Sequence, residues 1–548
     1  MLNKVYYGDN LEVLRKYIKD ETIDLCYIDP PFNSKRNYNQ IYNNLGKEDK
    51  AQAQAFVDTW TWDTMAEEGF AEITSNYNGV FTKQSIELII GLSKVLGKGS
   101  LLAYLISMTL RIAEIYRVLK DTGSFYFHCD PTASHYLKII IDAIFCAKGG
   151  DFRNEIIWER TNAHNIKSNY FGRTHDIIFF YSKSNNYTWN QLYSDYSEAQ
   201  LSRYKKDENG RLYKAENLTM TSNTRNFNWR GTLPPANRGW GASIDKLEQW
   251  YKEGKILLKK DGSPRMDGLK IYLDELKGKL LNDNWYDIDR VGNTSNERLG
   301  YPTQKPEALL ERIIKASTNE GDLILDAYCG CGTTIAVAER LKRNWIGIDI
   351  TYQSVSVMLK RLEDHYGKSC IDNISLHGVP KDFESAEMLA NKKDDRVRKE
   401  FEKWAVLTYS NNRAMINEKK GGDKGIDGIA YMVDSNEQGE NEIKPIIFSV
   451  KSNQTLSPSV IRDLNGTIER ENAAMGYLIT LYPMNNLVKE SKDYGVYKNK
   501  LTGMDYKRIE VININEILEG KRLNVPTSLE VLKKAERKAK ENQEEMGF

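Results

Sequence analysis

Four consecutive residues, Asp29-Pro30-Pro31-Phe32, have the types and the order needed to act on a conjugated amine. The exocyclic amine of a nucleobase is a poor nucleophile because its lone pair is delocalised into the ring. The Asp29 carboxylate and the Pro30 carbonyl can accept the amino hydrogens, which turns the lone pair toward an electrophile. The prolines fix the backbone, and Phe32 offers a face for an unstacked base. The alternative is a strand end followed by a Pro-Pro turn that serves only the fold.

A second group with chemistry is the glycine-containing turn Asp326-Ala-Tyr-Cys-Gly330-Cys-Gly332-Thr333-Thr334, between a predicted strand and a predicted helix. Glycines let the backbone of such a turn approach a ligand at a helix N-terminus. Asp349 ends the next predicted strand about 20 residues later, where a ribose-binding carboxylate belongs. The chain has no complete Gly-x-x-x-x-Gly-Lys-Ser/Thr phosphate loop. These acidic groups therefore favour S-adenosylmethionine, which has a ribose and an ammonium group but no phosphate.

Strands and helices alternate around both groups. Strand patterns occur at 23–29, 123–130, 155–160, 176–182, 323–328 and 344–350, and helical patterns at 10–19, 132–146, 306–317 and 333–342. This alternation predicts an α/β fold. It also places both active groups at strand ends.

The periodicity breaks down between about 185 and 300, and a charged stretch at about 380–400 precedes further strands at 428–433, 445–451 and 476–482. We predict four segments. They are a catalytic half (1–184), a recognition insert (185–300), a cofactor-binding half (301–385) and a C-terminal domain (386–548).

Composition sets outer limits on the function. The chain has 548 residues, 40% hydrophobic and 28% charged, which predicts a globular protein of two or more domains. It has no apolar run of about 20 residues and no signal-peptide core, so we expect a cytoplasmic protein with no membrane partner. Its six cysteines are scattered and are expected to be reduced thiols rather than zinc ligands or disulfides. The net charge of +1 neither favours nor excludes nucleic acid.

The predicted insert is locally basic. Residues 203–240 contain eight Lys or Arg against three acidic residues, and five of the basic residues are candidates for DNA contacts: Lys205, Lys206, Arg225, Arg230 and Arg238. Aromatic residues are interleaved with them: Tyr204, Tyr213, Phe227, Trp229 and Trp240. Basic groups for phosphates beside aromatic faces for bases favour a DNA-binding segment. The alternative is a solvated surface loop.

Together these features resemble the β-class amino-methyltransferases of DNA, which include the modification subunits of many restriction systems. The resemblance covers about the first 385 residues. It rests on GDNLEVL (8–14), IDPPFN (28–33), FHCDPTASHYLKIIIDAIF (127–145), RNEIIWER (153–160), HDIIFFYSKS (175–184), YPTQKPEALLERII (301–314) and DAYCGCGTT (326–334). It implies a class I S-adenosylmethionine-dependent methyltransferase fold, Rossmann-like and permuted, because the catalytic half precedes the cofactor half.

The resemblance also implies roles for individual residues. The target-base site would be Asp29, Pro30, Pro31 and Phe32, and the cofactor site would include Asp9, Lys305, Pro306, Asp326, Gly330, Gly332, Thr333 and Asp349. A leading Asp is more usual for adenine N6 and a leading Ser for cytosine N4, so we expect adenine. One departure is Ala327-Tyr328, where the family more often has Pro-Phe, although Tyr328 keeps the aromatic surface. The implied partners are double-stranded DNA and either a second copy of the chain or a restriction-system subunit.

The C-terminal segment resembles an Mrr-type restriction endonuclease domain of the PD-(D/E)xK superfamily, on KEFEKWAV (399–406), KKGGDKGIDG (419–428) and FSVKSN (448–453). By that resemblance Asp427 would hold a divalent metal such as Mg²⁺, Lys451 would polarise the phosphate, and Glu402 would be a third member. The departure is Ser449, where the motif has Asp, Glu or Gln, because a serine hydroxyl is a weak ligand for a hard cation. The domain would therefore cleave DNA feebly, depend on Glu402, or only bind DNA.

Three other functions compete with a DNA methyltransferase. One is a combined methyltransferase and endonuclease in a single chain. A DNA-binding module with an inactive cofactor site is disfavoured because both active motifs are intact, and a protein-glutamine methyltransferase because its cofactor half normally comes first. His128 and His175 lie on apolar strands and are interpreted as structural residues.

Overall fold

The protein is described by a computed structural model. It covers residues 3–31, 36–40, 43–44, 47–48, 53–58, 60–161, 169, 171–221, 224–292, 295–299, 301, 303–391, 395–411, 413–416, 425–436 and 441–525. Phe32 lies outside these residues. The chain divides into two compact units, one formed by residues up to 190 together with those from 283 onward, the other by residues 191–282.

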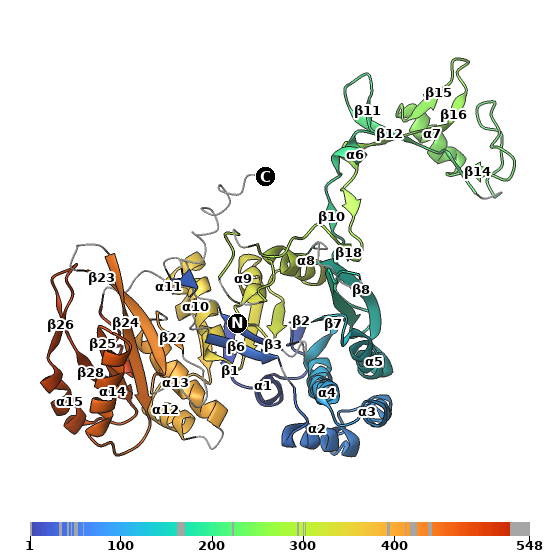
Figure 1. Cartoon of the computed structure of the whole chain (residues 1–548). Coiled ribbons are helices and arrows are strands. Elements are labelled where there is room, and N and C mark those ends of the chain that lie inside the picture. Colours follow the sequence, from blue (N-terminus) through green and yellow to red (C-terminus); the bar gives the residue numbers. More distant parts are fainter. Residues whose placement is uncertain are drawn as a thin grey trace. The chain divides into compact units, whose positions relative to one another are not determined.

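The first unit is built on a nine-stranded sheet (Figure 1). In spatial order its strands are β18 (Asn284–Trp285), β8 (Asp151–Glu159), β9 (His175–Ser182), β7 (Leu119–Cys129), β2 (Ile23–Ile28), β19 (Leu323–Asp326), β20 (Asn344–Asp349), β1 (Asn3–Tyr7) and β21 (Ile374–His377). All neighbours pair in parallel except those of β9, which is antiparallel to β7 and β8. The carboxyl ends of β1, β2, β19 and β20 therefore meet at one edge of the sheet.

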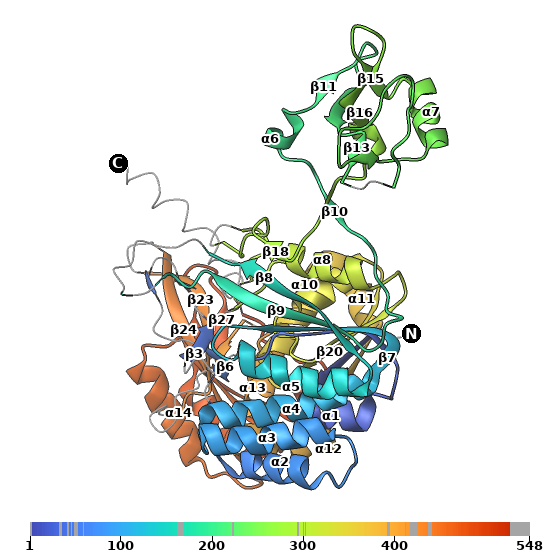
Figure 2. The same cartoon turned by 90° about the vertical axis from the view of Figure 1, so that its right-hand side faces the viewer.

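Helices cover both faces of this sheet, which explains why its central strands are apolar on both sides. Figure 2 shows α3 (Lys83–Leu96), α4 (Ser100–Val118) and α5 (Ser134–Phe145) along one face, and α8 (Glu307–Ser317) and α10 (Tyr352–Tyr366) along the other. Two apolar cores result, one under α1 (Asn10–Tyr17) and α3–α5, the other under α8, α9 (Thr333–Arg340) and α10. Other elements here are α2 (Thr64–Ser75), η1 (Cys146–Lys148), α11 (Lys368–Asp372), and the pairs β3 (Arg36–Gln40) with β6 (Ala53–Asp58) and β4 (Asn43–Asn44) with β5 (Lys47–Glu48).

The C-terminal part of the same unit has its own five-stranded sheet, in the order β22 (Met415–Ile416), β23 (Gly428–Ser435), β24 (Asn441–Lys451), β25 (Met475–Thr480) and β28 (Ile509–Asn513). Helix α14 (Ser459–Arg470) packs through Ile461 and Leu464 with Ile447 of β24. On α13 (Asp395–Tyr409), Phe401 and Trp404 belong to the core that contains Phe448. Further elements are α12 (Phe383–Ala390), α15 (Asn485–Ser491), η3 (Lys492–Tyr494), α16 (Ile514–Leu518), and the pair β26 (Val496–Lys498) with β27 (Asp505–Lys507).

The apolar core around α8 and α10 is continuous with the core around α13. A polar contact joins the two parts as well, since the Tyr352 hydroxyl of α10 lies 3.1 Å from the Thr408 hydroxyl of α13. The predicted boundary at 386 falls inside α12, which begins after a capping box formed by Asp382 and Ser385.

The second unit is a small α/β fold. Its four-stranded sheet has the order β11 (Lys205–Lys206), β12 (Leu212–Glu216), β16 (Pro264–Tyr272) and β15 (Ile256–Leu258), with α7 (Ile244–Lys252) beside it. Its remaining elements are α6 (Glu198–Leu201), η2 (Leu273–Glu275), and the pairs β10 (Tyr193–Ser194) with β17 (Lys279–Leu280) and β13 (Thr219–Met220) with β14 (Gly239–Trp240).

The compact unit of residues 191–282 falls within the segment that is predicted as an insert, 185–300. The Asn190 amide donates to the Lys315 and Thr318 carbonyls at 3.0 and 2.9 Å, which ties residue 190 to the first unit. On the other side, β18 pairs with β8 of the main sheet. Within the described ranges, no helix combines the length and the apolar character needed to cross a membrane.

Candidate functional site

A cavity of about 1310 Å³ opens at the edge of the main sheet where β1, β2, β19 and β20 end. The structure brings nine of the predicted site residues to its wall: Asp9, Asp29, Pro30, Pro31, Lys305, Asp326, Gly330, Thr333 and Asp349. Pro306 and Gly332 are not among the lining residues. The cavity thus joins the predicted base site and the predicted cofactor site in one space.

Asp29 follows β2 directly and is the central polar group of this cavity. Its Oδ2 forms an ion pair with Lys305 Nζ. Its Oδ1 is buried and accepts no hydrogen bond from the described residues. A buried oxygen without a donor is costly, so Oδ1 has the capacity to accept a hydrogen bond from a ligand in the cavity.

Lys305 comes from a strained turn that also lines the cavity. Thr303 has a φ of 62°, in the left-handed region that a β-branched residue rarely adopts. Backbone strain of this kind concentrates at functional sites. Pro306 then precedes α8 as its N-cap residue, which fixes the direction in which the turn enters the helix.

His128 lies behind Asp29 in a buried polar cluster. Its Nδ1 is 2.9 Å from the Tyr27 hydroxyl and 3.9 Å from Asp29 Oδ1, and its Nε2 is 3.4 Å from Asp176 Oδ2. Asp176 is paired with Arg160 at 2.9 Å. The ring is fully buried, with no exposed surface. This placement agrees with a structural histidine that supports the Asp29 end of the cavity.

Two more carboxylates lie on the neighbouring strands. Burial, with the charges of Asp29 and Asp349 adding to it, raises the pKa of Asp326 to about 7. Burial also raises the pKa of Asp349, although Asp349 accepts hydrogen bonds from Gly330 N and Thr351 N, both at 2.9 Å. Desolvated carboxylates whose negative charges oppose one another favour a ligand that brings positive charge and hydrogen-bond donors.

The two glycines of the turn have different reasons to be glycine. Gly330 has a φ of 49° and lies beneath the Tyr301 ring, which a Cβ would meet at 3.4 Å. Gly332 has a φ of 74°, and a Cβ there would meet Met358 Cγ at 2.4 Å. Helix packing against α10 and a left-handed N-cap conformation of α9 require the glycine at 332, whereas its close approach to the cofactor stays a prediction.

Asp9 combines a place in the cavity wall with a structural role. It caps α1 by accepting from Leu11 N at 2.9 Å and pairs with Arg111 at 2.8 Å. Thr333, also predicted for the cofactor, accepts from Arg361 at 3.1 Å and is buried. Both side chains are therefore fixed before any ligand arrives.

Sequence reasoning missed several lining residues. Asn10 bridges the two halves, since its amide donates to the Ala327 carbonyl at 2.7 Å and its oxygen accepts from Arg111 at 2.6 Å. Ile350 is 59% exposed although it is apolar, and it follows Asp349 in the wall. Tyr301 donates to or accepts from Ser354 at 3.0 Å. Of these residues, only Ile350 could have been found from the sequence, because an apolar residue directly follows the predicted ribose carboxylate.

The basic residues of the 191–282 unit fall into two groups. Lys205 and Lys206 are exposed on β11, and neither forms an ion pair with a described residue. Arg230 instead pairs with Glu248 at 2.8 Å and lies 3.6 Å over the Tyr251 ring, and Arg238 donates to the Thr219 carbonyl at 2.8 Å. Arg225 is exposed and donates to the Gly241 carbonyl at 3.2 Å.

The aromatic residues predicted to stack on bases include two that cannot do so. Trp229 and Trp240 are 2% and 0% exposed and form the core of this unit with Leu218 and Leu247. The stacking interpretation is wrong for both, because a small fold needs large apolar side chains for its own core. Phe227 packs against the same core and is partly buried.

In the C-terminal domain, Glu402 of α13 interacts electrostatically with Asp427 and Lys451. Burial and the Asp427 charge raise the pKa of Glu402 to about 7, while the Lys451 charge acts in the opposite direction. Asp427 Oδ2 accepts from Val450 N at 2.6 Å, and Ser449 is 4% exposed. Within the described ranges, no three His, Cys, Asp or Glu side chains form a group that could hold a metal.

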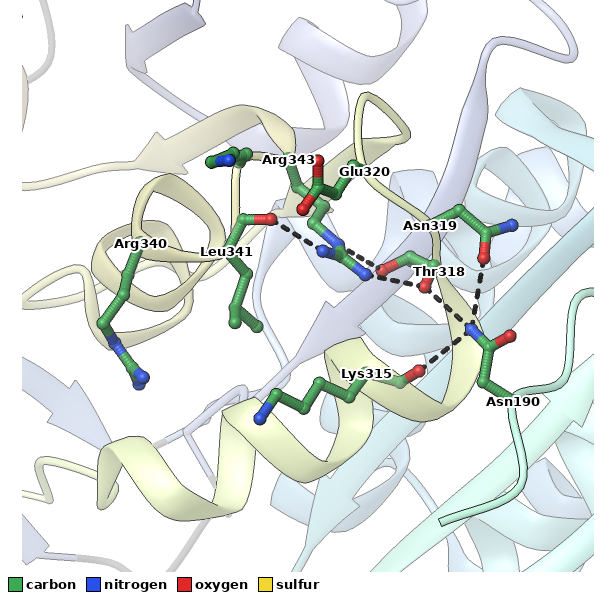
Figure 3. Close-up of a pocket in the computed structure, with 9 residues that line it drawn as sticks. Asn190, Lys315, Thr318, Asn319, Glu320, Arg340, Leu341 and Arg343 are labelled. Atoms are coloured by element: carbon green, nitrogen blue, oxygen red, sulfur yellow. Dashed lines mark hydrogen bonds between the residues drawn. The ribbon is translucent and has the colours of Figure 1, made fainter.

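A second hollow, of about 460 Å³, lies at the opposite edge of the main sheet, before β19 and β20 (Figure 3). Arg343 donates to the Thr318 and Leu341 carbonyls at 2.8 and 2.6 Å, and Asn190 donates to Thr318 from the other side. These hydrogen bonds connect Asn190 with the loops that precede β19 and β20.

Comparisons with known proteins identify the family. Residues 23–360 match the family model described as DNA methylase, which is more than half of the chain. The chain belongs to this DNA methylase family. Residues 397–512 match a restriction endonuclease family model, so the predicted Mrr-like C-terminal domain is confirmed.

Curated relatives agree with this assignment. The chain is 31% identical over 263 residues to the type II methyltransferase M.EcaI of Enterobacter cloacae, a match that covers 47% of this chain and 57% of that protein. It is 24% identical over 366 residues to the DNA adenine methyltransferase YhdJ of Escherichia coli strain K12, covering 66% and 84%. Among solved structures, TTHA0409 of Thermus thermophilus with S-adenosyl-L-methionine matches with a TM-score of 0.33 at 12% identity, covering 69% of this chain and 98% of that one.

Proposed function

We propose that this protein transfers a methyl group from S-adenosylmethionine to the exocyclic amine of a base in double-stranded DNA, most specifically adenine N6. The observation that carries the proposal is the buried Asp29 Oδ1, which accepts no hydrogen bond from the described residues and lies in the same cavity as Asp326 and Asp349. The leading Asp of the tetrapeptide and the similarity to a DNA adenine methyltransferase support adenine.

In this proposal Asp29 acts on the amine and the backbone orients it. Asp29 Oδ1 accepts one amino hydrogen and the Pro30 carbonyl the other, so the nitrogen lone pair points away from the ring plane. Lys305 holds Oδ2 and prevents rotation of the carboxylate. The nitrogen forms a bond to the methyl carbon while the carbon–sulfur bond breaks, and the bond's electron pair stays on sulfur. One amino proton then leaves through Asp29 or water.

The residues of the cavity fit S-adenosylmethionine. When bound, it supplies an electrophilic methyl group on a positively charged sulfur. Asp326 would pair with its ammonium group, Asp349 would accept from its ribose hydroxyls, and Ile350 would pack on its adenine. Each of these pairings stabilises a group whose burial is otherwise unfavourable.

Several finer features follow from the same proposal. The 191–282 unit serves as the target-recognition region, supported by its exposed Lys205 and Lys206. The order of the base site and the cofactor turn along the chain is the permuted one. The enzyme works in the cytoplasm in a restriction or other defence role, as a homodimer or with a restriction-system subunit.

A second activity, DNA cleavage by the C-terminal domain, is favoured by one observation. Glu402 is close enough to Asp427 and Lys451 to interact with both electrostatically, and burial and the Asp427 charge raise its pKa to about 7. A divalent cation such as Mg²⁺ would relieve the repulsion between Asp427 and Glu402 and would activate water there. The serine at 449 leaves such a site one anionic ligand short.

The first prediction concerns Asp29. We expect Asp29→Ala to lower methyl transfer by at least about a hundredfold while cofactor affinity stays within about twofold, because the carboxylate serves the amine rather than the methyl donor. Tritium transfer to unmethylated duplex DNA and calorimetric titration of the cofactor measure the two effects. The control is Asp121→Ala, because Asp121 is an exposed carboxylate near the first residue of β7. Normal transfer by Asp29→Ala would rule out the assignment.

The second prediction uses the pKa of Asp326, which burial raises to about 7. Only the ionised carboxylate pairs with an ammonium group, and a raised pKa means that its ionised fraction grows as the pH rises through 7. Cofactor affinity should therefore increase about tenfold between about pH 6 and pH 8. Asp326→Asn should flatten this dependence, whereas Asp322→Asn, before the same strand, should keep it. A wild-type affinity that does not change over this range would contradict the role of Asp326.

The third prediction tests the 191–282 unit. Replacing Lys205 and Lys206 together by Ala should weaken binding to duplex DNA and lower the slope of log affinity against log salt by about two, because two phosphate contacts are lost. The equally exposed pair Lys259 and Lys260 follows β15, at the other edge of the same small sheet, and serves as a charge-matched control. Fluorescence anisotropy over a salt series measures both. Equal slopes for the two double variants would refute a DNA contact at β11.

The fourth prediction concerns cleavage. We expect nicking of unmethylated duplex DNA that needs high Mg²⁺ or Mn²⁺ and rises between about pH 6 and pH 8, because Glu402, with a pKa of about 7, must ionise to bind metal. Asp427→Asn and Lys451→Ala should abolish nicking. Lys444→Ala on the same strand, where Lys444 pairs with Glu442, should not. If the wild type nicks nothing at any metal concentration, the cleavage proposal is refuted.

A further inference from the structure

Part of the wall of the predicted cofactor cavity lies outside residues 23–360, the segment that matches the DNA methylase family. Lys399, Glu400 and Lys403 of α13 line this cavity, and all three lie beyond residue 360, inside the segment that matches a restriction endonuclease. Residues 399 and 403 are one helical turn apart and 400 lies beside them, so one face of α13 is turned to the cavity. The C-terminal domain therefore contributes side chains to the site of the other domain.

Glu400 makes the decisive contacts on this face. Its Oε2 accepts from the Tyr7 hydroxyl at 3.0 Å and from Tyr352 N at 3.2 Å, and its Oε1 pairs with Lys403 at 2.8 Å. Tyr7 pairs with Asp349 across β1 and β20, and Tyr352 begins α10 three residues after Asp349. The Glu400 carboxylate of the C-terminal domain thus contacts both the β1 residue that pairs with Asp349 and the first residue of α10, which follows Asp349 closely in the chain.

The energetics favour a fixed arrangement. The side chains of Glu400 and Lys403 are 13% and 12% exposed, so removing either leaves a largely desolvated charge without its partner. Tyr352 N is one of the amides that no turn of α10 satisfies, and a carboxylate is stabilised at that end of a helix. Burial and the Glu400 charge raise the pKa of Tyr7 well above its usual value, so its hydroxyl stays a donor.

We propose that α13 of the endonuclease-like domain completes the cofactor site of the methylase domain, with Glu400 as the residue that positions the Asp349–Tyr352 loop for the ribose of S-adenosylmethionine. This inference rests on the proposed methyl-transfer function. Through Glu400, cofactor binding and the docking of α13 stabilise each other, because a coupling between two equilibria acts in both directions.

The test compares variants of the full chain. Glu400→Ala should raise the dissociation constant of S-adenosylmethionine about tenfold, with kcat at saturating cofactor within about twofold, because the loop is displaced but the reacting groups are not. Glu400→Gln keeps an acceptor oxygen for Tyr7 and Tyr352, so its dissociation constant should rise less than about threefold. Glu384→Ala, at an exposed position of α12, is the charge-matched control and should bind as the wild type does.

A second measurement does not depend on turnover. Saturating S-adenosylmethionine should slow amide hydrogen exchange in residues 398–410 of the wild type and of Glu384→Ala, but not in Glu400→Ala. Tyr7→Phe removes one donor and leaves the Glu400–Lys403 pair intact, so a smaller loss of affinity in this variant supports the proposal even if Glu400→Ala folds poorly.

The outcomes separate the two hypotheses. If the wild type binds S-adenosylmethionine and methylates DNA while Glu400→Ala and Tyr7→Phe bind with unchanged affinity, the inference is overturned and the proposed function stands. If cofactor leaves the exchange of residues 398–410 unchanged in the wild type, the coupling is likewise overturned. If the wild type binds no cofactor, the proposed function fails and the inference fails with it.

Discussion

The site depends on holding carboxylates out of water at one edge of a parallel sheet. Asp29, Asp326 and Asp349 follow or end β2, β19 and β20, which are adjacent strands, so the topology alone brings them together. The charges of Asp29 and Asp349 oppose the ionisation of Asp326, and Asp29 forms an ion pair with Lys305. This unfavourable arrangement of charges persists because the strands are buried on both faces, which holds their ends in place. Ligand donors and cations then gain more from binding here than they would in water.

The same physics explains which parts of the fold could be predicted from the sequence. Strands β2, β19 and β20 are short apolar runs ended by Asp, and their type and position follow from the pattern. The first strand, β1, carries Asn3 and Lys4 before its apolar residues, so it lacked a clear pattern, although it pairs with β20 on one side and β21 on the other. Helix α4 is apolar nearly all round because it lies beneath other helices, which removes the periodic signal.

Residue roles were less predictable than residue positions. Lys305 was expected at the cofactor, and it forms an ion pair with Asp29 of the predicted base site. Trp229 and Trp240 were expected on a surface, and they form a core because their unit is too small to fold without them. Gly332 was expected to face a ligand and instead packs under Met358. In each case a local pattern was visible, while the neighbour that decides the role comes from a distant part of the chain.

The join between the two domains shows the same dependence on distant neighbours. A domain boundary was predicted at the charged stretch of 380–400, yet α12 crosses residue 386 and one apolar core continues through α13. Successive residues of a helix are rotated by about 100°, which turns Glu402 by about 200° from Glu400 and hence to nearly the opposite side. Glu400 therefore contacts the methylase cavity while Glu402 interacts with Asp427 and Lys451. A helix that must satisfy both environments, with Phe401 and Trp404 buried between them, cannot be separated from either domain without exposing apolar surface or charge.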